Sequence, residues 1–113
     1  MKTTYGTMYY VDDMKKSVAH YTKLLGMKPG YASPEWTEFP LGGHRLCLHQ
    51  KAGGVKTRPN GVLIVNVKAV KSLFKTLKGR KLDAYGLHEV HPGAWSFTLK
   101  DASGNEVSLY GPP

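Results

Sequence analysis

The second half of this chain repeats the pattern of the first half. Each half begins with an extended run of β-branched and aromatic residues. An apolar stripe with helical spacing comes next, and further extended runs follow it. At a constant offset of 56, Met14, Val18 and Tyr21 match Val70, Phe74 and Leu77, and at an offset of 61, residues 46–49 match residues 107–110. One half has too little core to fold alone, so we expect the halves to pack together, within one chain or across a dimer.

Each half reads as a strand, a helix and about three more strands. We therefore predict an α+β fold of two βαβββ modules that form a curved mixed sheet with an open concave face. We expect a single domain of 113 residues, with modules at about 1–52 and 60–113 and a linker at 51–60 that contains Gly and Pro. In the first helix, Asp12 or Asp13 can cap the first turn and Gly26 can supply the left-handed end; in the second, Gly79 follows the apolar stripe.

Composition narrows the class of protein. The single Cys47 cannot form an intramolecular disulfide, which favours a reducing, cytoplasmic setting. No run of about 18 apolar residues is present, and the N-terminus has no apolar segment typical of a signal peptide, so we expect no membrane partner. The net charge of +8 favours anionic or neutral partners. Much of the excess lies in residues 68–81, on the helix side opposite the apolar stripe, where a solvated face is favoured over a nucleic-acid interface.

Two local motifs accompany the repeat. One is Val11-Asp12-Asp13-Met14, followed by Ser17, Tyr21 and Leu24-Leu25-Gly26; the other is the DASGN turn at 101–105. With the doubled βαβββ plan, these motifs make the chain similar to the vicinal oxygen chelate superfamily, which includes glyoxalase I, bleomycin-resistance proteins and extradiol dioxygenases. The departures are Ala102 in place of the usual Pro and His20 in place of the usual Phe, and neither disturbs the fold.

The resemblance also implies where a divalent metal would be held. Catalytic members of the superfamily use one His or Glu from each of four strands, and the corresponding positions here are Gly6, Cys47, Val62 and Ser108. None of these is an imidazole or a carboxylate, and one thiolate cannot hold a catalytic metal. We therefore predict no metal and no other cofactor.

Strand alternation predicts which side chains line the concave face. The helix-facing set is expected to be Tyr9, Val11, Phe39, Leu41, Leu46, Leu48, Leu63, Val65, Phe97, Leu99, Val107 and Leu109. The predicted ligand-binding residues on the opposite face are Tyr10, Trp36, Glu38, His49 and Tyr110, with His91 at the mouth. The aromatic residues can stack on a planar ligand. Glu38 and His49 are candidates for an acid and base pair, although a role in orienting a ligand is favoured over catalysis.

Other groups offer alternatives. His88 and His91 lie three residues apart in GLHEVHPG, which we read as a loop, and with Glu38 and His49 they are candidates for a relocated metal site. Cys47 lies two residues from His49, but an inert buried thiol is favoured over a nucleophile.

Three functions follow from these patterns. The first is a metal-independent protein that binds a small neutral or anionic organic ligand, assembled as a homodimer. The alternative is an enzyme resembling lactoylglutathione lyase or a dioxygenase, with a relocated divalent metal, so the question of catalysis stays open. The second alternative is a basic nucleic-acid or protein-interaction module that uses the lysine-rich second helix.

Overall fold

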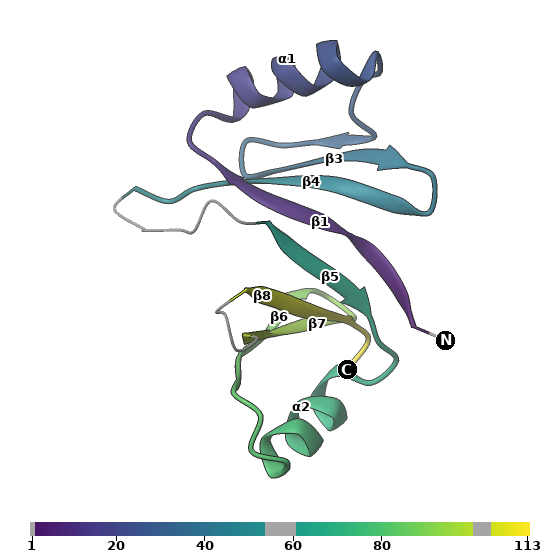
Figure 1. The fold of residues 1–113 in the computed structure, drawn as a ribbon, viewed down its shortest axis with the longest axis vertical. Coiled ribbons are helices and arrows are strands. Elements are labelled where there is room, and N and C mark those ends of the chain that lie inside the picture. Colours follow the sequence, from purple (N-terminus) through teal and green to yellow (C-terminus); the bar gives the residue numbers. More distant parts are fainter. Residues whose placement is uncertain (1, 54–60, 101–104) are drawn as a thin grey trace. The chain divides into compact units, whose positions relative to one another are not determined.

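The structure is a computed structural model that describes residues 2–53, 61–100 and 105–113. It divides into two compact units, drawn in Figure 1. The N-terminal module is Gly6–Gly61, and the C-terminal module is Val62–Pro113 together with Met1–Tyr5. Most of the predicted linker at 51–60 and most of the predicted DASGN turn lie outside the described residues.

The N-terminal module has one helix and a mixed sheet in the order β2-β3-β4-β1. Strands β1 and β4 are parallel, whereas β2 with β3 and β3 with β4 are antiparallel. The elements are β1 (Thr3–Val11), α1 (Met14–Leu25), β2 (Tyr31–Ala32), β3 (Trp36–Leu41) and β4 (His44–Gln50).

The C-terminal module repeats this arrangement in the order β5-β8-β7-β6. Strands β5 and β8 are parallel, and the other two pairs are antiparallel. The elements are β5 (Val62–Asn66), α2 (Val70–Gly79), β6 (Ala84–His91), β7 (Ala94–Lys100) and β8 (Glu106–Gly111). The predicted α+β fold of two βαβββ modules is confirmed. No helix among the described residues is long and apolar enough to cross a membrane.

Helix α1 begins and ends as its sequence predicts. The Asp13 carboxylate accepts a hydrogen bond from the backbone N–H of Lys16 at 3.1 Å, which satisfies one of the free donors of the first turn. Gly26 ends the helix with φ of 67°, and its N–H donates to the Thr22 carbonyl. Gln50 anchors the start of the helix to β4, because its Oε1 accepts from the Met14 N–H at 2.9 Å.

Helix α2 lacks the capping interactions that begin and end α1. Ala69 occupies the N-cap position and offers no side-chain hydrogen bond. Gly79 is the last helical residue rather than a left-handed end; Arg80 is the C-cap, and Lys81 adopts a φ of 61°. This difference from α1 follows from sequence, since no Ser, Thr, Asp or Asn stands at position 69.

Each helix covers one face of its own sheet. The core under α1 is formed by Met14, Phe39, Leu46 and Leu48, and the core under α2 by Val67, Val70, Ala84, Phe97 and Leu109. These contacts confirm the predicted strand alternation for most of the helix-facing set. Tyr9, Leu41 and Leu63 are exceptions, since they are exposed by 38%, 43% and 40% at positions where core packing was predicted.

Candidate functional site

The strand register of the N-terminal module places three ring side chains in one row. His49 on β4 is directly opposite Tyr10 of β1 and directly opposite Trp36 of β3. The ring of His49 lies 5.3 Å from that of Tyr10 and 5.6 Å from that of Trp36, measured between centroids. All three are partly exposed, and they occupy the sheet face opposite the core under α1.

Glu38 is next along β3 on the same face. Its Oε2 accepts a hydrogen bond from Trp36 Nε1 at 2.9 Å, and its Oε1 lies 3.6 Å from Arg45 Nε. The carboxylate is therefore engaged by a neighbour on each side. Glu38 is opposite Cys47, so it is diagonal to His49, a separation of about 7 Å in an antiparallel pair. This arrangement suits a positioning role for Glu38 better than a proton transfer with His49.

His49 has an unusual environment for a polar ring. Its Nδ1 atom is buried and has no hydrogen-bond partner among the residues that the structure describes. Burial lowers the pKa of His49 below its usual 6.5, because the positive charge of an imidazolium is poorly solvated there. The ring is therefore neutral at pH 7, with one nitrogen left without the partner that buried polar groups normally have.

Cys47 is two residues before His49 on β4, on the same face of the sheet, and it is fully buried. Burial, followed by the nearby charge of Glu38, raises the pKa of its thiol to about 12. The thiol is therefore protonated at neutral pH, and a protonated thiol is a poor nucleophile. This supports the inert role favoured for Cys47 over the nucleophilic one.

The other two predicted site residues lie together in the C-terminal module. His91 Nε2 is 3.1 Å from the Tyr110 hydroxyl, and the Tyr110 ring packs against that of Tyr5 with centroids 5.1 Å apart. The segment containing His88 and His91 was predicted as a loop. That prediction is wrong, because both residues belong to β6, where register shifts at Tyr85/His88 and Glu89/His91 interrupt the regular alternation.

The four positions implied for a metal do not fit one. A Cβ atom at Gly6 would overlap the backbone carbonyl oxygen of Arg45, so the first position has no room for a ligating side chain. Cys47 would supply a single thiolate, and Val62 is a buried hydrocarbon. Within the described ranges, no three His, Cys, Asp or Glu side chains are grouped closely enough to hold an ion.

The lysines of α2 are exposed, as predicted for a solvated face. Two of them lie over aromatic rings of their own module: Lys71 Nζ is 4.0 Å from the ring centroid of Trp95, and Lys78 Nζ is 5.8 Å from that of Phe74. Two of the lysine ammonium groups on this helix therefore make cation–π contacts within the module.

Arg45 was missed in the sequence analysis. It is on β4, two residues before Cys47, and strand alternation alone would have placed it on the face of His49. Its guanidinium group forms an ion pair with Glu38 beside the aromatic row.

A comparison with protein families assigns the chain to one of them. The sequence model of the Glyoxalase/Bleomycin resistance protein/Dioxygenase superfamily matches residues 6–109, and the chain belongs to that superfamily. No curated protein matches the chain.

Solved structures share the fold at low identity. A Streptomyces coelicolor methylmalonyl-CoA epimerase in complex with 2-nitronate-propionyl-CoA is 10% identical, with a TM-score of 0.79 over 96% of this chain and 92% of that chain. A Legionella pneumophila chain described as an NAD-dependent benzaldehyde dehydrogenase is 18% identical, with a TM-score of 0.76 over 95% and 97%. A superfamily member from Vibrio splendidus is 12% identical, with a TM-score of 0.70 over 100% of both chains.

Proposed function

We propose that this protein binds a small planar organic ligand on the open sheet face of the N-terminal module, without the metal used by catalytic members of its superfamily. The observation that carries the proposal is the buried, unpartnered Nδ1 of His49 in a row with two aromatic rings. A ligand that stacks on Tyr10 or Trp36 and hydrogen-bonds to His49 would use both features.

The charges around the row favour a neutral or anionic ligand. The chain carries +8, and on the ligand face Arg45 offsets the negative charge of Glu38. The Glu38 carboxylate is engaged by Trp36 and Arg45, so it holds these two side chains in place. The neutral His49 ring can donate or accept a hydrogen bond according to its tautomer, and it adds no positive charge of its own at pH 7.

Three probes of one shape test this assignment: benzamide, benzoate and benzamidinium are neutral, anionic and cationic. The chain has two tryptophans, so a Trp95→Phe background leaves Trp36 as the reporter for a fluorescence titration in EDTA. We expect benzamide and benzoate to change the Trp36 emission saturably and benzamidinium to bind more weakly. Loss of one neutral hydrogen bond in His49→Ala should weaken binding roughly fivefold.

His20→Ala is the matched control, since His20 is exposed on α1. It should bind the probes as the parent does. Equal affinity of His49→Ala and the parent, or binding that appears only after a divalent cation is added, would contradict the proposal. A circular dichroism spectrum identical to that of the parent checks that each variant is folded.

We also propose that the protein is a homodimer. Exposed apolar side chains in both modules, including Leu24, Leu41, Leu63 and Val90, offer surface that a second copy can cover. Sedimentation at micromolar concentration should give about twice the 12.5 kDa monomer mass. A single 12.5 kDa species would rule out this assembly.

A further inference from the structure

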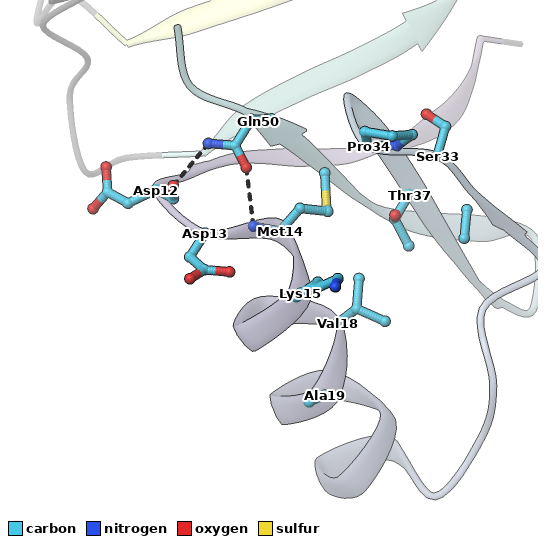
Figure 2. A pocket seen from close by; sticks show the side chains of 11 residues that line it. Asp12, Asp13, Met14, Lys15, Val18, Ala19, Ser33, Pro34, Thr37 and Gln50 are labelled. Carbon is cyan, nitrogen blue, oxygen red and sulfur yellow. Dashed lines mark hydrogen bonds between the residues drawn. The ribbon is translucent and has the colours of Figure 1, made fainter. Parts of the chain in front are cut away.

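A groove lies on the opposite side of the N-terminal sheet from the His49 row, between the first half of α1 and the strands β2 and β3 (Figure 2). Its volume is about 720 Å³, and it is open to solvent along much of its length. The lining is mostly apolar and comprises Asp12, Asp13, Met14, Lys15, Val18, Ala19, Ala32, Ser33, Pro34, Thr37 and Gln50.

Thr37 is the polar group at the floor of this groove. Its side chain is fully buried, and within residues 2–53, 61–100 and 105–113 its hydroxyl has no hydrogen-bond partner. Figure 2 shows Thr37 directed into the space between β3 and α1, on the side of Met14 and Val18. A buried hydroxyl without a partner is unfavourable, and such a group needs a reason to be present.

The C-terminal module shows what this space holds when it is filled. Thr37 is opposite Leu48 in the N-terminal module, and Phe97 is opposite Leu109 at the equivalent place in the C-terminal module. On the helices, Val18 corresponds to Phe74 at the offset of 56. The rings of Phe97 and Phe74 pack edge to face with centroids 5.2 Å apart, whereas the N-terminal module has a threonine and a valine there. Two small side chains in place of two aromatic rings leave room under α1.

We propose that this groove is a second ligand site, and that it binds a neutral, largely apolar molecule carrying one carbonyl or hydroxyl oxygen. The apolar walls bury the hydrocarbon part, and the oxygen pairs with the Thr37 hydroxyl. Because this hydroxyl is fully buried, the ligand reaches it only when side chains of the lining shift, and the flexible Met14 is one of these.

The rim of the groove favours a neutral ligand. Asp13 is held at the helix start by its bond to the Lys16 N–H, and Asp12 lies 3.5 Å from Lys51 Nζ. With Lys15 also in the lining, the acidic and basic groups balance. No single sign of charge dominates the rim, and an ionic ligand would have to lose its hydration against the apolar walls, which costs free energy.

The probe for the test is 2-heptanone, followed through the backbone amide signals of Ala19, Ala32 and Ser33 in ¹H–¹⁵N spectra. We expect saturable shifts at these amides. Thr37→Val removes the hydroxyl at nearly constant shape and should weaken binding roughly fivefold, whereas Thr37→Ser keeps the hydroxyl and should stay within about twofold of the parent. Val18→Phe should abolish binding by filling the groove as Phe74 does in the other module.

Heptanoate is the anionic control and should bind more weakly than 2-heptanone. His49→Ala, on the other sheet face, should leave 2-heptanone binding unchanged, so the two sites can fail independently. Two results would overturn the proposal: no shift of the groove amides up to the solubility of 2-heptanone, or equal affinity of the parent and Thr37→Val. If Val18→Phe does not fold, the Thr37 pair still decides the outcome.

Discussion

The two modules have the same backbone plan but different side chains at equivalent places. Tyr10, His49 and Trp36 form a row in the N-terminal module, and the equivalent row in the C-terminal module, by strand register, is Asn66, Tyr110 and Ser96. One row is aromatic with a buried imidazole nitrogen, and the other has a single ring. The aromatic side chains are therefore concentrated on one copy of a repeated scaffold, because topology depends on the apolar pattern while individual surface side chains are free to differ.

On the sheet faces that pack against the helices, the C-terminal module is the one with more aromatic side chains. Phe97 is fully buried against Phe74 in the C-terminal module, whereas Thr37 stands at the matching place in the N-terminal module beside a groove. The C-terminal module is thus better packed under its helix, and the N-terminal module is better capped at its helix start.

The largest effect should come from removing the ring that fills the C-terminal core. Phe97→Ala should lower the free energy of unfolding by about 3 to 5 kcal/mol, because it leaves a cavity next to Phe74. Thr37→Ala, at the matching place in the N-terminal module, should lower the free energy of unfolding by much less. Urea unfolding of both variants measures the difference, and equal losses would refute the contrast in packing.

A second prediction concerns the position that family members use for their first ligand. Gly6→His should destabilise the protein by about 2 kcal/mol, because its Cβ meets the Arg45 carbonyl, and it should not create a metal site. Val62→His, at the equivalent place in the C-terminal module, supplies the comparison, since a side chain is already accommodated there. Thermal melts with and without Zn²⁺ measure both effects; zinc stabilisation of the Gly6→His variant would show that the site can be rebuilt.

Thr37→Val should act in the stabilising direction. Replacing an unpaired buried hydroxyl with a methyl group removes a desolvation penalty, and we expect a gain of about 1 kcal/mol in the absence of ligand. Chemical denaturation is the measurement. A loss of stability would mean that the hydroxyl has a partner in solution.

The smallest effect concerns pH and is specific to the N-terminal row. Burial lowers the pKa of His49 in the folded state, so the unfolded chain takes up a proton first as the pH falls through 6.5. Stability is therefore fully present above pH 6.5 and is lost below it until the folded pKa is reached. His49→Gln should show a smaller fall in melting temperature between pH 7 and pH 5 than His20→Gln does. Equal falls in melting temperature for the two variants would show that burial does not lower the pKa of His49.

Much of this fold is predictable from sequence because local signals agree with the repeat. Asp13 and Gly26 mark the ends of α1, and the offset between halves reproduces the strand register. Strand β6 was missed because Gly86, His88 and its bulges break the alternation on which a strand prediction depends. The exposure of Tyr9 was missed because alternation assigns a sheet face but not the extent of helix cover.

The candidate site was predictable only in outline. Alternation places Trp36, Glu38 and His49 on one face, but the bond from Trp36 to Glu38 and the unpartnered His49 nitrogen depend on side-chain rotamers. The Thr37 groove was not foreseen, since its signal is the difference between Thr37 and Phe97, and those two positions align only once the register of β3 and β7 is known.

The central claim is that His49 contacts a ligand in the absence of metal. Its most direct test is the imidazole ¹⁵N spectrum of protein treated with EDTA, recorded during titration with benzamide or benzoate. We predict a saturable shift of the His49 imidazole signals, because a ligand stacked on Tyr10 or Trp36 contacts this ring and changes its environment. A His49 signal that stays unchanged while the probes bind elsewhere, or that responds only after a divalent cation is added, would contradict the account.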